Sequence, residues 1–252
     1  MSWDRILPPL ILAAVFLLVW QIASDSGFLA RTLGLDPLLV PSPAEIVTSL
    51  YRDRAVLADN AAVTLVEVLA GFAVAVVVGL VAAIGFHLYE PLRKAAYPVV
   101  VASQTIPVIV IAPILVVWFG YGIGPKLAVI ALICFFPIAV NTLDGLRSVP
   151  GELVEMMKSL GAGRSRILTD VELPSALPYA FSGARIAVAV AVIGAVFGEW
   201  VGASSGLGYL MLQDNAQLET ARLFASVFLL AAMALGLFGL VSLAERAAVR
   251  WR

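Results

Sequence analysis

Six long apolar runs, separated by short polar segments, divide the chain. They cover approximately residues 6–22, 61–86, 96–119, 126–143, 179–201 and 223–243. Each has about the 17–25 residues that an α-helix needs to cross the hydrocarbon core of a bilayer. The pattern therefore predicts an all-α membrane protein with six transmembrane helices, organised as one domain over residues 1–252.

The first run also has the length of a cleavable signal peptide. Its N-terminal flank carries only Arg5, which Asp4 offsets, and no convincing small-x-small cleavage site follows it. We therefore interpret the run as a retained span, with a cleaved signal peptide as the alternative.

Composition supports a membrane protein and excludes several kinds of chemistry. The chain is 62% hydrophobic and 13% charged, whereas soluble domains have about 45–50% apolar and about 25% charged residues. The single cysteine, Cys134, excludes an intrachain disulfide and a cysteine metal cluster. The net charge of −1 gives no indication of a nucleic-acid partner.

Basic residues favour an orientation with the N-terminus in the cytoplasm. In that orientation ten basic residues lie on the cytoplasmic side: Arg5, Arg93, Lys94, Arg147, Lys158, Arg164, Arg166, Arg246, Arg250 and Arg252. Five lie on the opposite side: Arg31, Arg52, Arg54, Lys126 and Arg222. Arg185 is not counted because it lies just inside the fifth run. The asymmetry predicts that both termini and the segment 147–178 are cytoplasmic.

Two ladders of small residues run along the apolar segments. The second run carries Gly71, Ala75, Gly79 and Ala83, and the fifth run and its extension carry Gly194, Gly198, Gly202 and Gly206. Small residues at this spacing let helix backbones approach closely in lipid. The ladders predict helix packing, and the neighbour could belong to the same chain or to another.

The third run is interrupted by prolines and polar residues. Pro98, Pro107 and Pro113 lie within it, and "SQTIP" occupies residues 103–107. One interpretation is a kinked packing helix. We favour a helix that lines a pathway through the membrane, because polar groups at this depth usually face a wet interior. The candidate pathway residues are Gln104, Thr105, Asn141 and Glu199, with Trp118 as a wall.

Other ionisable residues near the runs have a simpler interpretation. His87 and Asp144 fall at the cytoplasmic ends of their runs, where interfacial water can solvate them. Glu67 and Glu199 lie toward the outer side and are either interface residues or part of an outer vestibule. Glu199 is the better candidate, because it lies within a glycine ladder.

Motifs for catalysis and cofactor binding are absent from the sequence. There is no G-x-x-x-x-G-K-[ST] phosphate loop, no nucleophile elbow and no spacing of metal ligands, and the chain has one histidine. "GAGRSR" at 161–166 lacks the third glycine of a dinucleotide loop and follows no strand. We therefore expect no catalytic residue, no metal and no cofactor in this chain.

A polar segment, "EMMKSLGAGRSRILTDVELP" at 155–174, lies between the fourth and fifth runs. Pro150 and the following acidic residues favour the start of a helix. Gly161 and Gly163 break that helix, and a second short helix is predicted to end at Pro174. The apolar side of this pair lies on the bilayer surface or in a groove of a protein partner. The methionines favour the partner, because flexible thioether side chains adapt to protein grooves.

The spacing of Glu155, Gly161 and "LP" at Leu173–Pro174 resembles the EAA loop of ABC importer permeases. Met156 and Met157 stand where that motif has alanines. The resemblance extends to "VPSPAEIV", "IPVIVIAPILVVWFGYG" and "GLGYLM", which are similar to the nitrate, sulfonate, taurine and hydroxymethylpyrimidine branch of those permeases.

The resemblance implies a MetI-like fold in the bacterial inner membrane. Its loop, including Arg164, would form coupling helices on a separate ATPase subunit, which would use the ATP and Mg. It also implies an extracytoplasmic substrate-binding protein and a second permease copy, giving a homodimer in the membrane lipid.

The segment 198–224 resembles most closely the permeases assigned to hydroxymethylpyrimidine, a thiamine precursor. Alkanesulfonate, taurine and nitrate are the alternative substrates. Two alternatives come from other classes. An ion-coupled secondary transporter would need a carboxylate relay and often two matching halves, and a membrane scaffold would leave the third run unexplained.

Overall fold

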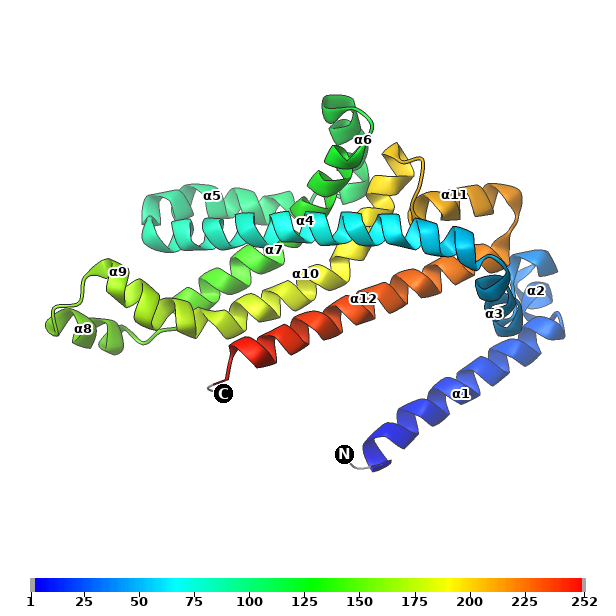
Figure 1. The fold of residues 1–252 in the computed structure, drawn as a ribbon, viewed down its shortest axis with the longest axis horizontal. Coiled ribbons are helices and arrows are strands. Elements are labelled where there is room, and N and C mark those ends of the chain that lie inside the picture. The colour runs from blue at the N-terminus through cyan, green and yellow to red at the C-terminus, as the bar shows by residue number, and fades with distance from the viewer. Residues whose placement is uncertain (1–2, 251–252) are drawn as a thin grey trace.

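The computed structural model describes residues 3–250 and is all-α, as predicted (Figure 1). Its helices are α1 (Trp3–Asp25), α2 (Phe28–Leu33), α3 (Pro43–Arg52), α4 (Arg54–Leu88), α5 (Glu90–Ser103), α6 (Val108–Phe119), α7 (Ile123–Arg147), α8 (Gly151–Ser159), α9 (Arg164–Ile167), α10 (Leu173–Gly202), α11 (Leu207–Gln217) and α12 (Thr220–Ala248). A 3₁₀ turn, η1, spans Pro37–Leu39, and a π-helical segment, η2, spans Leu168–Glu172. Arg252, one of the predicted cytoplasmic basic residues, lies outside the described residues.

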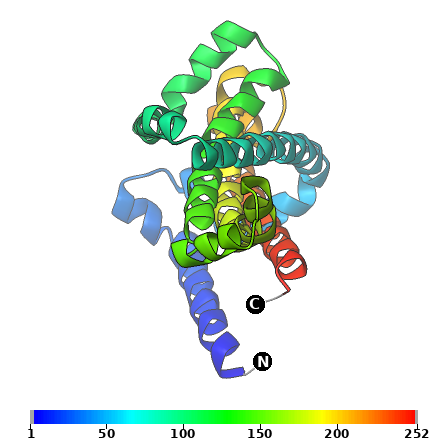
Figure 2. The ribbon, with the colours of Figure 1, turned by 90° about the vertical axis from the view of Figure 1, so that its left-hand side faces the viewer.

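Five helices between residues 3 and 250 are long and apolar enough to cross a membrane, and the bent pair α5–α6 makes six if it is one span. The third apolar run is not the single kinked helix considered above, because α5 and α6 meet at 105°. Pro107 lacks an N–H and has extended backbone (ψ 126°), and its ring disfavours helical geometry at the preceding residue. Figure 2 shows α6 projecting above the rest of the bundle, although Val116 of α6 still packs against Gly202 of α10.

The core forms where α7 packs between α4 and α10. A Cβ at Gly71 would lie 2.6 Å from the Cβ of Ile130, and one at Gly79 would lie 2.8 Å from Cγ2 of Ile138. From α10, a Cβ at Gly194 would lie 3.2 Å from the Cα of Ile130. Both ladders therefore face α7 of the same chain, which answers the question of whose helices they contact. Gly198 also faces α7, at Lys126, whereas Gly202 lies against Val116 of α6.

We expect Gly79→Ala to destabilise the chain by about 1–3 kcal/mol, because its methyl group overfills the contact with Ile138. Gly236→Ala is the matched control, since none of the residues that the structure describes lies within 4 Å of a Cβ at that position on α12. A helical Gly→Ala change without a clash should be neutral or stabilising by about 0.5–1 kcal/mol. Thermal unfolding of both variants in detergent measures the difference, and equal shifts would contradict this packing.

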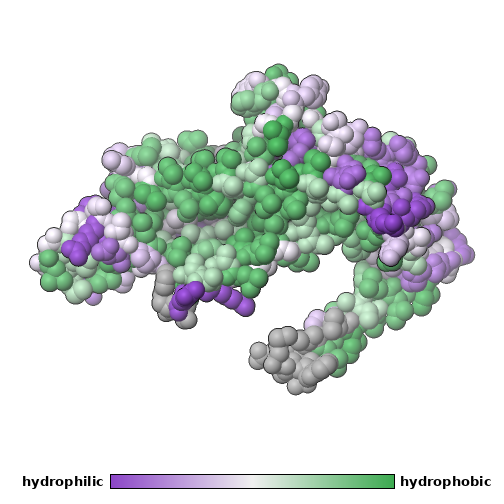
Figure 3. Space-filling view, in the orientation of Figure 1, coloured by the Kyte–Doolittle hydropathy of each residue, from purple (hydrophilic) through white to green (hydrophobic). Residues whose placement is uncertain are grey.

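Polar side chains gather at the two ends of the bundle. Figure 3 shows a broad hydrophobic area over the middle of the molecule, with hydrophilic atoms at the α8–α9 end and at the opposite end near α3 and α11. Large apolar residues of α1, α4 and α12 are exposed, including Leu12, Val81 and Leu235. A bilayer or another helix is the natural environment for such side chains. The α8–α9 segment and the α3–α11 region therefore lie on opposite sides of the apolar band.

Candidate functional site

The candidate coupling element consists of α8, the turn at Gly161 and α9. Pro150 precedes the first turn of α8, and Glu152 lies within it, next to the positive end of the helix dipole. Gly161 has φ +81°, a left-handed conformation that side chains other than glycine rarely adopt. The N–H groups of Gly161 and Ala162 donate to the carbonyls of Lys158 and Met157, at 2.9 and 3.0 Å. The turn is thus a glycine C-cap that reverses the chain between two helices.

The second helix of the element does not end at Pro174, contrary to the sequence prediction. Residues 164–202 form one continuous helical stretch, in which η2 joins α9 to α10. The N–H of Leu173 donates to the carbonyl of Leu168, which is a π-type bond. A wider π turn just before Pro174 relieves the conflict between a proline ring and the preceding helical turn. The candidate coupling element is therefore continuous with a spanning helix.

Several side chains that the sequence assigned to coupling are exposed at the surface of this element. Glu155, Met156 and Arg164 are exposed, whereas Met157, Leu173 and Pro174 are partly buried. Met156 is 52% exposed, and the neighbouring Leu160 is 76% exposed. Met156 and Leu160 therefore leave an apolar surface that a partner could cover.

A buried ionic cluster lies directly behind the element. Glu172, at the end of η2, has a side chain that is only 5% exposed. Nη1 of Arg164 donates to its Oε1 at 2.6 Å. Nε2 of His87, in the last turn of α4, lies 2.9 Å from its Oε2, and this contact is not a hydrogen bond. Nη2 of Arg164 lies 2.8 Å from the same imidazole nitrogen.

Sequence reasoning missed this cluster. It interpreted His87 as an interfacial residue solvated by water, whereas the ring contacts Glu172 and Arg164. It gave Glu172 no role of its own. The sequence offered two signals. Glu172 directly precedes the Leu-Pro pair, and the single histidine of the chain directly follows the second apolar run.

The predicted pathway residues do not come together. Gln104 ends α5 and Thr105 lies in the following turn, and both are exposed. Trp118, in the last turn of α6, is 73% exposed. Asn141 is partly buried on α7, where its amide donates to the carbonyl of Pro137 at 2.7 Å. These residues face different surroundings within the single chain.

Glu199 has a local structural role. Its side chain is 1% exposed. Its Oε1 accepts from the hydroxyl of Thr64 at 2.6 Å, and its Oε2 accepts from the backbone N–H groups of Gly208 and Tyr209 at 2.5 and 3.3 Å. Those N–H groups belong to the first turn of α11, where a carboxylate is favoured by the helix dipole. Glu199 therefore caps α11 and ties it to α10 and α4.

A buried ion pair lies on the same side of the bundle. Nζ of Lys126 on α7 lies 2.5 Å from Oε1 of Glu67 on α4, and the two side chains are 8% and 4% exposed. Oε2 of Glu67 has no hydrogen-bond partner among the described residues. The pair fixes α4 against α7, because each charge would be costly to bury alone.

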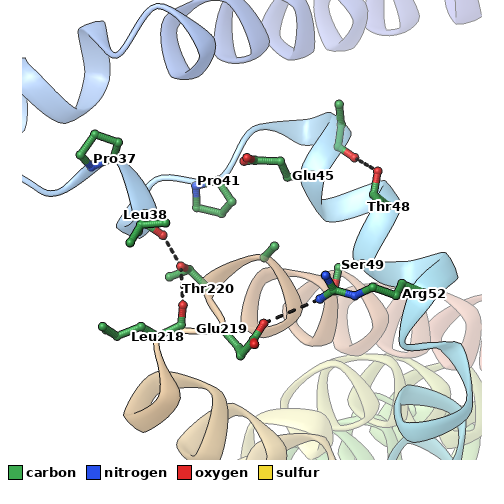
Figure 4. A pocket seen from close by; sticks show the side chains of 12 residues that line it. Pro37, Leu38, Pro41, Glu45, Thr48, Ser49, Arg52, Leu218, Glu219 and Thr220 are labelled. Carbon is green, nitrogen blue, oxygen red and sulfur yellow. Dashed lines mark hydrogen bonds and ion pairs between the residues drawn. The ribbon is translucent and has the colours of Figure 1, made fainter.

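The opposite end of the molecule carries the cavity shown in Figure 4. It measures about 500 Å³ and lies between α3 and the turn from α11 to α12. Arg52 and Glu219 face each other across it at 3.7 Å, and the hydroxyl of Thr220 donates to the carbonyl of Leu38. Leu218 turns the chain here with φ 60°. The cavity has a mixed polar and apolar lining and lies at the end of the molecule opposite α8 and α9 (Figure 1).

A buried pair secures the nearby junction of α11 and α12. Asp214 is fully buried, and Nη2 of Arg222 lies 2.6 Å from its Oδ1. Burial raises the pKa of the Asp214 carboxyl, and the hydrogen bond from Arg222 opposes that shift. At the surface of α3, the hydrogen bond from Arg52 lowers the pKa of Asp53.

The structure is an all-α bundle with five or six candidate spans and an exposed two-helix element at one end. These features define an integral membrane protein with a surface that a partner could cover. The chain belongs to the family of binding-protein-dependent transport system inner membrane components, which matches residues 75–250. It is therefore an inner-membrane permease subunit of an ABC importer. This membership decides against the ion-coupled transporter and the scaffold.

The names of two curated relatives state different substrates. The chain is 37% identical to the formylaminopyrimidine transport permease protein ThiX of Halalkalibacterium halodurans, over 98% of this chain and 96% of the relative. It is 44% identical to the riboflavin transport system permease protein RibX of Chloroflexus aurantiacus, over 64% of this chain and 60% of that protein.

A solved structure shares the fold. One chain of the MetNI methionine ABC transporter, in an inward-facing conformation, superimposes with a TM-score of 0.67. It has 22% sequence identity and covers 78% of this chain and 98% of its own length. The likeness confirms the MetI-like fold.

Proposed function

We propose that this permease imports hydroxymethylpyrimidine or a related pyrimidine precursor of thiamine. The observation that carries the proposal is the 37% identity, along nearly the whole chain, to a relative named for formylaminopyrimidine. Alkanesulfonate, taurine and nitrate remain the alternative substrates. The relative named for riboflavin adds riboflavin to these alternatives.

Residues 147–178 form the cytoplasmic coupling loop in this proposal, with α8 and α9 seated in a groove of a separate ATPase. The exposed apolar side chains of Met156 and Leu160 support this role, and so does the continuous helical connection of α9 to α10. Glu155, Gly161 and Arg164 would form the contact, together with Met157. The ATPase would use the ATP and Mg, and this chain would carry no cofactor.

The complete importer would contain two permease copies, two ATPase subunits and a substrate-binding protein on the extracytoplasmic side. Both termini of the permease would be cytoplasmic, with residues 1–252 as a single domain. Exposed apolar residues of α1, such as Leu12 and Phe16, support a second copy or lipid as their neighbour. Gln104, Thr105 and Trp118 would then line a pathway completed only in the dimer, together with Asn141.

Uptake into proteoliposomes that contain the permease, its ATPase and its binding protein tests the substrate. We expect ATP-dependent accumulation of radiolabelled hydroxymethylpyrimidine, and little accumulation of taurine, nitrate or riboflavin. A preference for one of these other compounds would contradict the substrate without affecting the coupling proposal. Vesicles that lack ATP are the control.

Cysteine accessibility tests the pathway. Cys134 is buried, with its Sγ 3.2 Å from the carbonyl oxygen of Ala187, so Cys134→Ser supplies a background without a native thiol. In the assembled importer, single cysteines at positions 104 and 105 should react with water-soluble reagents in the resting or the ATP-bound state. Reaction with lipid-soluble reagents alone would contradict the assignment.

A further inference from the structure

The cluster around the buried carboxylate of Glu172 joins the neighbouring elements α9 and η2 to α4, which lies far from them in the chain. His87 ends α4, Arg164 begins α9, and Glu172 is the last residue of the π segment before α10. The three contacts are 2.6, 2.8 and 2.9 Å. A carboxylate at 5% exposure requires such partners, because burying an unpaired charge is costly.

The neighbouring ion pair on the same element is different. Arg166 and Asp170 lie 3.4 Å apart, one helical turn from each other, with both side chains more than half exposed. That pair stays within α9 and η2 and does not reach α4. Glu172 is thus the carboxylate that connects the element to the end of α4, through His87.

The position of the cluster has a mechanical consequence. A displacement of α8 and α9 moves α10 directly, because the helix is continuous from residue 164 to residue 202. The π segment between them is a place where a helix can bend, since its hydrogen bonds are wider than those of an α-helix. A second connection is needed if α4 is to follow the same displacement.

We propose that Glu172 is a positioning residue that clamps the coupling element to α4. With Arg164 and His87 it would transmit a displacement of α8–α9 to α4 and α10 together, so that ATP hydrolysis produces one concerted movement. The inference rests on the proposed coupling function of residues 147–178. It adds two residues outside the exposed docking surface: Glu172, and His87 on α4, which Glu172 contacts.

Glu172→Gln in the reconstituted importer tests the clamp, because it removes the charge and keeps the side-chain size. We expect the ATPase to co-purify and to hydrolyse ATP, while the number of substrate molecules moved per ATP falls at least about tenfold. Hydrogen bonds to charged groups contribute enough for a factor of about ten or more. If Glu172 had only a structural role, Glu172→Gln would lower the melting temperature. The ratio of transport to hydrolysis, measured well below that temperature, would then equal the wild-type ratio.

Two further variants keep the test decisive. His87→Gln keeps a polar side chain that can accept from Arg164, loses the ring and leaves the contact between Arg164 and Glu172 intact, so a smaller fall in the same ratio is expected. Asp170→Asn is the matched control, because it removes an exposed carboxylate of the same element, and its ratio should stay at the wild-type value. If Glu172→Gln does not accumulate in the membrane, His87→Gln supplies the answer.

Two results would overturn the proposals separately. A wild-type ratio of transport to hydrolysis in Glu172→Gln, or in His87→Gln if the first variant does not accumulate, would overturn the clamp. Normal uptake by a variant with a disrupted turn at Gly161 would instead overturn the coupling function on which the clamp rests.

Discussion

Gly161→Asp is expected to lower uptake by more than about tenfold while the permease accumulates in the membrane at the wild-type level. The φ of +81° at this position costs a residue with a Cβ about 1–2 kcal/mol. Among residues 3–250, nothing lies within 4 Å of a Cβ built there, so the added side chain does not clash with this part of the permease. Its charge would lie where the groove of the ATPase is proposed to close, and an unpaired carboxylate in an interface is costly.

Uptake and ATPase co-purification at matched membrane expression measure this effect. Gly151→Asp is the control, because it adds the same side chain at the start of α8 without a left-handed backbone and without a neighbour within 4 Å. A carboxylate in the first helical turn is favourable there, so uptake should stay near normal. Normal uptake by Gly161→Asp would remove the proposed role of the turn.

Glu155→Ala should have a milder effect than Gly161→Asp. Glu155 is exposed in the middle of α8, and alanine preserves the helix. The substitution therefore removes only a carboxylate that could pair with a basic residue of the ATPase. We expect a partial loss of co-purification in the same assay, and a loss larger than that of Gly161→Asp would contradict the ranking.

Lys126→Met is expected to destabilise the chain by about 3–5 kcal/mol, because it leaves Glu67 buried without its partner. The double variant Lys126→Met/Glu67→Leu should recover most of that loss, since an apolar pair of similar volume is often as stable as a buried ion pair. Thermal or denaturant unfolding in detergent measures both free energies of unfolding.

Lys94→Met is the matched control for this pair. Lys94 lies 3.1 Å from Glu90 at an exposed site on α5, and exposed ion pairs contribute about 0–1 kcal/mol. Its melting temperature should therefore change little. Two results would contradict the importance of burial. One is an equal loss of stability in Lys94→Met and Lys126→Met, and the other is a double variant Lys126→Met/Glu67→Leu that is as unstable as Lys126→Met.

The sequence alone determined the features that depend on nearby residues. The length of each apolar run identified the membrane helices, because a span is defined by consecutive residues and the bilayer thickness. The spacing of Glu155, Gly161 and the Leu-Pro pair located the two-helix element, because a glycine turn and a helix start are local events. These signals were sufficient for the all-α class and for the family.

Only the tertiary structure decided how the helices meet. The 105° bend after α5 and the π segment before Pro174 depend on how each proline is accommodated by its surroundings. The two glycine ladders both face α7, which their own spacing could not reveal. Glu199 caps α11, because the loop after α10 folds back and brings the first turn of α11 against the Glu199 carboxylate. His87 and Glu172 lie 85 positions apart in the sequence, and no local pattern encodes a contact between residues so far apart in the chain.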